Sequence, residues 1–376
     1  MQTIAQTSDK EDVKALWAYA FNEQEPFLSE YFDNFWKAEN AVIHKDMHLI
    51  GALQMIPYNI CLRGAFTPAS YIVGVSITPE ERGKGYSTQL MRDCLLEQKK
   101  RGETISLLIP FSYEFYKKLG YRLCYTLDIY KTETLNIPSF NKDYSIQKMS
   151  IENFTDLNNV YIEFCQNKNG YILREKNDWE YIFFEHKLSG GFIYGAYSNG
   201  QLKGYISYNK SSEGLYVREL IYTNRDSLFC LLAFIKSHFS AKQSIKIRTS
   251  SDNMLLNVLK EPKNTLKVAP TVMARIVDVP SALALSDIGD LKIYVYDELL
   301  PENCGVYKKE AENIIKTDES YDFLIDIGTL TQLVMGFYSA SELNFLGLIE
   351  ADTKIIEKLN KIFPKTENYI NHIMEE

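Results

Sequence analysis

The sequence of 376 residues lacks the features typical of membrane-spanning, secreted and nucleic-acid-binding proteins. No apolar stretch approaches the roughly 18 to 20 residues that cross a bilayer. The first twenty residues contain Asp, Lys and Glu where a signal peptide would be apolar. The net charge is −8 and the sequence has no long basic run, although a net charge does not reveal a local basic patch. We therefore expect a cytoplasmic protein without a membrane span, with no nucleic acid as its main partner and with a cationic substrate.

Patterns typical of metal and disulfide sites are also missing. The six cysteines lie far apart, form no CxxC pair and do not cluster with the five histidines. A metal centre needs several such ligands at short spacing, and a disulfide framework is rare in the cytoplasm. The sequence therefore predicts reduced thiols in the core and no metal site.

The first 130 residues alternate helical and strand-like patterns. Apolar spacing and turn residues predict helices at 10–21, 87–101 and 114–119, and strands at 41–44, 49–62, 71–77, 105–109 and 121–130. The predicted fold class is therefore mixed α/β, with a helix between two neighbouring strands.

A second block, from about residue 146 to 278, repeats this plan. Its stretch GLYVRELIYTNRDSLFCLLAFIKSHF matches YIVGVSITPEERGKGYSTQLMRDCLLEQK as strand, loop and helix. The loop of the second copy, 222–226, has no glycine, and without glycine the backbone does not easily approach a phosphate. We interpret the second block as a copy that lost its ligand. The run TVMARIVDVP, 271–280, is expected to close it, before a third block of strands (291–296, 321–326) and helices (329–338, 353–362).

The loop of the first copy is the strongest functional signal. Neither a Walker loop nor a GxGxxG fingerprint is present, since Thr88 occupies the third glycine position. The run Arg82-Gly83-Lys84-Gly85-Tyr86-Ser87 does match a pyrophosphate cradle of the form Arg/Gln-x-x-Gly-x-Gly/Ala at a helix N-terminus. Backbone N–H groups of a first helical turn lack internal acceptors, so they bind anions there. An ordinary glycine-containing surface turn is the alternative.

Together with FYKKLGY about thirty residues later, VGVSITPEERGKGYS resembles the acetyl-CoA-binding core of the GCN5-related N-acetyltransferases. The degenerate second copy and the third block with DLKIYVYDELLPENCGVY extend the resemblance to the Eis (enhanced intracellular survival) family, over essentially the whole chain. The resemblance implies two tandem acetyltransferase domains, 1–142 and 143–283, a sterol-carrier-like domain, 284–376, and a hexamer. It also implies acetyl-CoA as cosubstrate and amine acceptors such as aminoglycosides, polyamines or lysine side chains.

The resemblance also implies roles for individual residues. Tyr116 would be the general acid that protonates the departing thiolate. Gly74 would mark a bulge that opens a slot for pantetheine, with a packing glycine as the alternative. The expected acetyl-CoA contacts are Val75, Ser76, Ile77, Arg82, Gly83, Lys84, Gly85, Tyr86, Ser87 and Thr88.

The sequence also contains candidates for the base and for the acceptor pocket. The five histidines offer no evident base: His44 and His48 flank a hairpin turn, and His186, His238 and His372 are expected to be solvated. By resemblance, the base is the terminal carboxylate, here Glu376, although the tail ends in two acids where an aromatic is typical. Glu23, near Glu25, and Trp36 would line the acceptor pocket, and solvated acids and a core tryptophan are the alternatives.

A function from a different class stays open. The third block would be the working part of a lipid- or ligand-binding protein, with a vestigial acetyltransferase site in the first block. The cradle and Tyr116 in the first copy, beside the loss of the cradle in the second, favour the enzyme.

Overall fold

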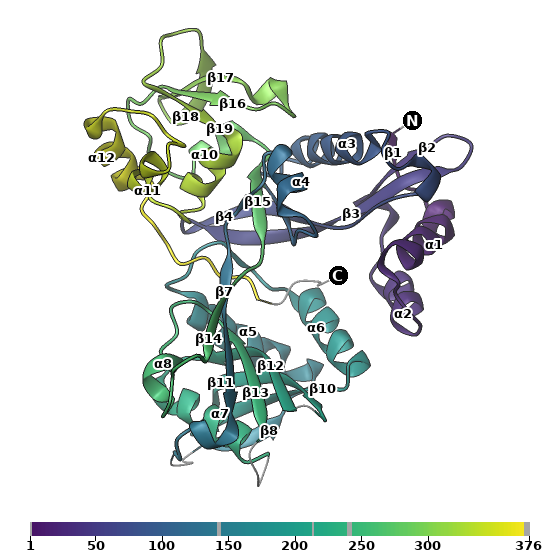
Figure 1. The fold of residues 1–376 in the computed structure, drawn as a ribbon, viewed down its shortest axis with the longest axis vertical. Helices are drawn as coiled ribbons and strands as arrows, with labels where there is room; N and C mark the ends of the chain where they lie inside the picture. The colour runs from purple at the N-terminus through teal and green to yellow at the C-terminus, as the bar shows by residue number, and fades with distance from the viewer. Residues whose placement is uncertain (1, 141–143, 213, 239–242, 372–376) are drawn as a thin grey trace. The chain divides into compact units, whose positions relative to one another are not determined.

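The structure, a computed structural model, describes residues 2–140, 144–212, 214–238 and 243–371. The chain forms two compact units (Figure 1). The first unit comprises Met1–Tyr125 and Thr271–Asn368, and the second comprises Thr126–Pro270 together with a short segment that starts at Tyr369. Each unit is built around its own mixed sheet.

The sheet of the first unit has the strand order β1-β2-β3-β4-β5-β15-β6. Only β4 and β5 pair in parallel among these neighbours, and α3 connects them. The elements are β1 (Gln2–Ile4), α1 (Lys10–Phe21), α2 (Phe27–Asn34), β2 (Ala41–Lys45), β3 (Leu49–Leu62), β4 (Ala65–Ile77), α3 (Tyr86–Lys100), β5 (Ile105–Leu108), α4 (Tyr113–Lys118), β6 (Arg122–Leu123) and β15 (Met273–Ile276). The predicted helix at 10–21 is confirmed, and those at 87–101 and 114–119 are confirmed to within one residue.

Helices cover both faces of this sheet (Figure 1). On β3, Leu53 and Met55 belong to the buried cluster that includes Leu90 and Cys94 of α3. Gln54, between them, bonds to Tyr31 of α2. Because successive side chains of a strand point to opposite faces, α3 lies on one face and α2 on the other. One face therefore carries the apolar cluster with α3, and the other carries the polar contact between Gln54 and Tyr31.

The structure corrects one expectation about strand order. The run at 273–276 does not close the second block; it forms β15, which pairs with β5 and β6 in the first sheet. In turn, the predicted strand at 121–130 is divided, and its second part, β7 (Thr126–Glu133), pairs with strands of the second sheet. The two repeats therefore exchange their closing strands, an arrangement that residue patterns do not specify.

The second unit has the strand order β14-β7-β13-β12-β11-β10-β8. Its buried cluster joins the sheet to apolar residues of α7 such as Leu228 and Leu231. The elements are β7, β8 (Ser145–Lys148), α5 (Phe154–Cys165), β9 (Tyr171–Ile172), α6 (Lys176–Leu188), β10 (Gly191–Ser198), β11 (Gln201–Ser211), β12 (Gly214–Tyr222), α7 (Arg225–Lys236), β13 (Ser244–Thr249), α8 (Leu255–Val258) and β14 (Leu266–Pro270).

The third block belongs to the first unit and has a small sheet of order β18-β17-β16-β19. Its α10 packs against β15 and β6 of the large sheet. The elements are α9 (Val279–Leu283), β16 (Ile293–Tyr296), β17 (Gly305–Glu310), β18 (Asn313–Thr317), β19 (Phe323–Asp326), α10 (Ile327–Val334), α11 (Ala340–Phe345) and α12 (Thr353–Ile362). In the part of the chain that the structure describes, no helix combines the length and the apolar character needed to span a bilayer.

Candidate active site

The predicted cradle lies between β4 and α3. After β4 a short 3-10 turn, Pro79–Glu81, leads into Arg82, and then Gly83 and Gly85 take φ values of 76° and 85°. These are left-handed conformations that residues with a side chain rarely adopt. A Cβ added at either glycine would meet no atom within 4 Å. The glycines are therefore required by the backbone path, and the space beside them is open.

The N-terminus of α3 is not capped by a side chain. Gly85 is its N-cap residue, and the first helical bond runs from the Gln89 N–H to the Gly85 carbonyl, at 3.2 Å. The N–H groups of the preceding residues, Tyr86 to Thr88, thus have no acceptor inside the helix. With the helix dipole, these donors form an anion-binding end.

The basic side chains of the loop already have contacts. Arg82 donates from Nε to the Ile77 carbonyl at 3.1 Å, and its guanidinium lies 5.6 Å from the Tyr19 ring centre. Lys84 pairs with Glu81 at 3.0 Å. Arg82 therefore fixes the turn between β4 and the loop. In the loop itself, the backbone donors of the helix are the groups best placed for an anion.

The corresponding helix of the second unit is closed by its own residues. Asn224 is the N-cap of α7, and its side chain accepts a hydrogen bond from the Ser227 N–H at 2.8 Å. The Ser227 hydroxyl in turn donates to the Asn224 carbonyl at 2.9 Å. A side chain thus occupies the position that would receive a phosphate, in agreement with the expectation that this copy lacks the cradle.

The strand before the cradle separates from its parallel neighbour. Pairing between β4 and β5 runs only from Ala69 to Ile72, whereas pairing with β3 continues to Ile77. The register with β3 shifts beside Gly74, whose φ is 69°. The bulge expected at Gly74 is therefore present, and the last residues of β4, including Val75 and Ile77, border a gap in the ladder. Their neighbour Ser76 is buried, and its hydroxyl donates to the Gly74 carbonyl at 3.1 Å.

Tyr116 lies on α4, in the same buried cluster as Ile72 and Leu108, the last paired residues of β4 and β5. Its side chain is 2% exposed. The rings of Phe111, Phe115 and Tyr121 surround it, with centroid distances of 5.4, 5.0 and 5.8 Å. Tyr116 is therefore part of the buried cluster to which the last paired residues of β4 and β5 also belong.

The residues proposed for the acceptor pocket lie in and around the α1–α2 segment. Trp36 is half-buried and stacks on Phe32 at 6.1 Å, and its indole N–H has no partner among the described residues. Glu23 is half-buried in the loop between α1 and α2. Glu25 is exposed and accepts from the Ser29 hydroxyl at 2.6 Å, a bond that lowers the pKa of its carboxyl. Glu25 therefore supports the first turn of α2.

Sequence reasoning missed one buried group on this face. Gln54 is 2% exposed, and its Oε1 accepts from the Tyr31 hydroxyl at 2.9 Å. Its Nε2 has no partner within the described part of the chain. A buried amide donor without an acceptor is costly unless a ligand or water satisfies it. The sequence around Gln54 carries no signal for this, because Tyr31 is distant along the chain.

Of the three histidines expected to be solvated, His186 is buried and His238 is half-buried. His186 is 3% exposed, and burial lowers its pKa to about 4. His238 accepts or donates at 2.7 Å to the Tyr208 hydroxyl. His44 is buried with its Nε2 2.8 Å from Asp93. The prediction was wrong for His186 because α6 packs it against Gly191 of β10, which hydropathy alone does not reveal. Glu376 and His372 lie outside the described residues.

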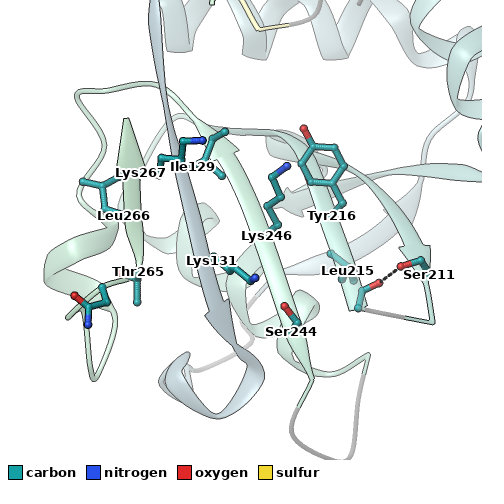
Figure 2. A pocket seen from close by; sticks show the side chains of 12 residues that line it. Ile129, Lys131, Ser211, Leu215, Tyr216, Ser244, Lys246, Thr265, Leu266 and Lys267 are labelled. Carbon is teal, nitrogen blue, oxygen red and sulfur yellow. Dashed lines mark hydrogen bonds between the residues drawn. The ribbon is translucent and has the colours of Figure 1, made fainter. Parts of the chain in front are cut away.

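The second unit contains a cavity of about 700 Å³ on its sheet (Figure 2). Its lining includes Lys131, Lys246 and Lys267 and no carboxylate. Lys131 and Lys246 lie directly opposite each other on β7 and β13, and Lys246 stands 4.5 Å from the Tyr216 ring centre. Three ammonium groups repel a cationic amine. The cavity is thus not a candidate acceptor site, and it shows that the net negative charge conceals a local basic cluster.

The candidate site thus combines an uncapped glycine loop before a helix, a strand that separates from its parallel neighbour and a buried tyrosine. Comparison with known proteins gives the class of the protein. Residues 3–124 and 170–276 each match a model of the acetyltransferase (GNAT) domain, and residues 279–371 match the sterol carrier protein domain. The chain is accordingly an acyltransferase with two GNAT domains and a sterol-carrier-like domain. No protein of curated function matches the sequence.

Solved structures show the same fold along the whole chain. A probable N-acyltransferase from Enterococcus faecalis is 23% identical, with a TM-score of 0.90 and coverage of 100% of this chain and 99% of that one. A GCN5-related N-acetyltransferase from Anabaena variabilis is 21% identical, with a TM-score of 0.86 and 98% coverage of both chains. Eis1 from Mycobacterium abscessus is 17% identical, with a TM-score of 0.82 and full coverage of both. At these identities the likeness concerns the fold.

Proposed function

We propose that this protein is a member of the Eis family that transfers the acetyl group of acetyl-CoA directly to a primary amine. The observation that carries the proposal is the open N-terminus of α3 behind Gly83 and Gly85, beside the end of β4 where its pairing with β5 has stopped. The second unit serves as an internal comparison, because the same helix end is closed there by Asn224.

We assign contacts to three parts of the cosubstrate: the pyrophosphate, the pantetheine and the thioester. The N–H groups of 83–88 would hold the pyrophosphate, with Arg82 and Lys84 adding positive charge at the loop. Backbone N–H groups of Val75 and Ile77 would hold the pantetheine amides and the thioester carbonyl, because the strand edge there is free of β5. Acetyl-CoA supplies an electrophilic thioester carbon and a thiolate leaving group.

The reaction moves two protons off the acceptor nitrogen and one onto the sulfur. An alkylammonium has a pKa near about 10, so the acceptor must lose a proton before its nitrogen can attack. As the C–N bond forms and the C–S bond breaks, the Tyr116 phenol would donate its proton to the sulfur, and the second proton lost by the nitrogen would restore the phenol. Tyr116 shares a buried cluster with Ile72 and Leu108, the last paired residues of β4 and β5, and this supports the role.

The acceptor that we propose is a small cationic amine or a lysine side chain. Glu23 and Trp36 would provide a carboxylate and an aromatic wall on the α1–α2 side, where the buried aromatic rings of α1 and α2 pack together. A net charge of −8 favours the approach of a cation. A hexamer remains a prediction of the family resemblance, and a cytoplasmic location remains a prediction of the sequence composition.

Thiol release from acetyl-CoA tests the activity directly. Aminoglycosides, polyamines and lysine peptides are compared at equal amine concentration, and at least one class is expected to release coenzyme A above the hydrolysis rate. If none does, and mass spectrometry finds a lipid in the purified protein, the lipid-binding alternative is correct.

Replacing Tyr116 with Phe tests the acid. The ring and its packing are kept while the phenol proton is lost, so kcat should fall by about ten- to a thousandfold with unchanged acetyl-CoA affinity. Tyr121→Phe is the matched control, because the Tyr121 hydroxyl bonds to Ser106 at 2.6 Å in the same cluster. Near-normal turnover of the Tyr116 variant would leave Tyr116 a packing residue.

The terminal carboxylate of Glu376 remains the predicted base. A few residues added after Glu376 would move the carboxylate away and should abolish turnover while acetyl-CoA binding persists. The measurement compares kcat and calorimetric affinity for extended and unextended protein. Equal turnover of the two forms would assign the base to another group, such as Glu23 or water.

A further inference from the structure

The helix that carries Tyr116 is too short to hold its own geometry. α4 has six residues, Tyr113–Lys118, and isolated helices of this length are unstable in water. Ser112 caps its N-terminus by accepting from the Phe115 N–H at 3.3 Å. The backbone closes its C-terminal turn, because the Leu119 and Tyr121 N–H groups donate to the Tyr116 carbonyl and the Gly120 N–H donates to the Lys117 carbonyl, each at 3.0 Å. Two arginines add further donors to this turn, and each is held by an aspartate of the third block.

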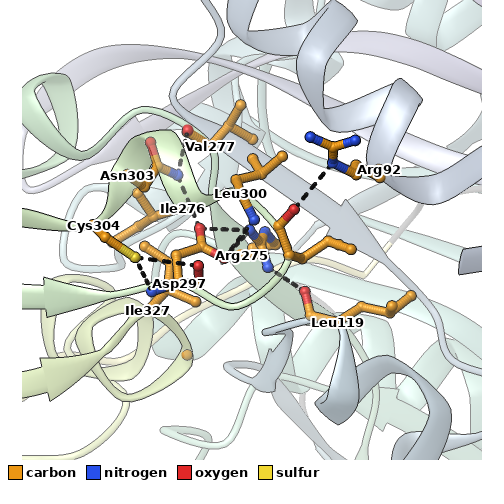
Figure 3. A network of polar contacts seen from close by, with 12 residues as sticks. Arg92, Leu119, Arg275, Ile276, Val277, Asp297, Leu300, Asn303, Cys304 and Ile327 are labelled. Carbon is orange, nitrogen blue, oxygen red and sulfur yellow. Dashed lines mark hydrogen bonds and ion pairs between the residues drawn. The ribbon is translucent and has the colours of Figure 1, made fainter. Parts of the chain in front are cut away.

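Arg275 of β15 forms the first of these contacts (Figure 3). Its Nη1 donates to the Leu119 carbonyl at the C-terminal end of α4, and its Nη2 lies 2.8 and 2.7 Å from the two carboxylate oxygens of Asp297. Both side chains are fully buried. Asp297 is fixed in turn by the Leu300 N–H at 3.0 Å and the Asn303 amide at 2.9 Å.

Arg122 of β6 forms the second contact. Its Nη1 donates to the Lys117 carbonyl at 3.1 Å, and its Nη2 lies 3.1 Å from Oδ1 of Asp326. Asp326 is itself the N-cap of α10, where it accepts from the N–H groups of Gly328 and Thr329 at 3.0 and 3.2 Å. The same carboxylate thus joins a helix of the third block to the helix of Tyr116.

Glycines allow both arginines to approach closely. A Cβ on Gly120 would lie 2.2 Å from Nη1 of Arg275 and 2.9 Å from Cγ2 of Ile327 in the third block. A Cβ on Gly328 would lie 2.7 Å from Cζ of Arg122. Side chains at these two positions would push the third block away from the end of α4.

We propose that the third block positions Tyr116 through Arg275–Asp297 and Arg122–Asp326, which hold the C-terminal turn of α4. This inference rests on the proposed function, because the position of the phenol matters for catalysis only if Tyr116 is the general acid. Arg122, Arg275, Asp297 and Asp326 are positioning residues that do not contact substrate. The sterol-carrier-like domain then acts as a support for the catalytic helix.

The Arg122–Asp326 pair is the one to test. Breaking the fully buried Arg275–Asp297 pair would strand a charge and risk unfolding the protein. Arg122 and Asp326 are 22% and 35% exposed, so their loss is tolerable. Arg122→Gln removes the link to both the Lys117 carbonyl and Asp326, whereas Asp326→Asn keeps an oxygen to cap α10 and removes only the charge.

Arg63→Gln is the matched control. Arg63 also joins the large sheet to the third block, donating to the Val334 and Leu333 carbonyls at 2.6 and 3.0 Å, but it lies at the turn between β3 and β4. All three variants should unfold at lower temperature. Only Arg122→Gln and Asp326→Asn should increase amide hydrogen exchange in 113–121 and lower kcat, by about tenfold, with unchanged KM for acetyl-CoA.

A double-mutant cycle separates positioning from general destabilisation. In a Tyr116→Phe background, Arg122→Gln should lower kcat no further, because the phenol it positions is already gone. Equal losses in both backgrounds, or unchanged exchange in 113–121, would overturn the proposal. If Tyr116→Phe alone leaves kcat intact, the acid assignment fails, and the exchange data alone then decide whether the third block holds α4.

Discussion

At the scale of single residues, the cradle depends on two glycines with left-handed φ and open space at the Cβ position. Gly85 lies directly at the N-terminus of α3, where three successive N–H groups lack internal acceptors. A side chain there would occupy the space of a bound pyrophosphate, and a carboxylate would oppose its charge.

We therefore expect Gly85→Glu to lose most of its affinity for acetyl-CoA, measured by calorimetry. Gly200→Glu is the matched control, since Gly200 has a φ of 76° and equally open surroundings in a turn of the second unit. Both variants should carry a similar backbone strain, and only the first should lose binding. Unchanged affinity in a folded Gly85→Glu protein would refute the cradle.

Sequence reasoning at this scale succeeds where a conformation depends on the local backbone. Gly83 and Gly85 could be singled out because glycine tolerates the conformation that the loop requires. Gln54 and the buried His186 could not, because their burial depends on Tyr31 and Gly191 reaching them from other elements. The roles of Tyr116, Glu23 and Trp36 stay predictions until the variants are measured.

At the scale of elements, β4 stops pairing with β5 after Ile72, and its register with β3 shifts beside Gly74. Gly74 has a φ of 69°, and a Cβ there would lie 2.3 Å from Cζ3 of Trp17 on α1. The bulge and the packing of α1 are therefore coupled at one residue, and both interpretations of Gly74, bulge and packing glycine, describe the same position.

Gly74→Ala should lower the unfolding free energy and weaken acetyl-CoA binding. Gly64→Ala isolates the backbone cost, since Gly64 has a φ of 75° with no atom near its Cβ, and that cost is about 1–2 kcal/mol. The clash with Trp17 should add about 1–3 kcal/mol, measured by denaturant unfolding. Equal losses of unfolding free energy in the two variants would mean that α1 moves aside at no cost and that Trp17 does not restrict residue 74.

At the scale of the whole molecule, the two GNAT domains differ in one decisive respect. The helix after the central strand is open in the first and capped by Asn224 and Ser227 in the second. Since both helices begin at equivalent points of the repeat, only the first should bind the pyrophosphate group.

Calorimetry should accordingly find one acetyl-CoA per chain. The site should disappear in Gly85→Glu and persist in Asn224→Ala, which removes the cap of the second unit without restoring glycines to its loop. A stoichiometry of two would contradict the interpretation of the second domain as a copy without ligand.

The sequence by itself determined the periodic elements, the three-block plan and the glycine loop, because helix spacing, strand alternation and left-handed turns are properties of neighbouring residues. The helices at 10–21 and 353–362 illustrate this, since the bounds predicted from residue patterns agree with those of α1 and α12. Tertiary structure alone decided which sheet each closing strand joins and which aspartates receive Arg122 and Arg275. Those pairings join residues far apart along the chain, and their energies depend on burial and geometry that exist only once the blocks have packed.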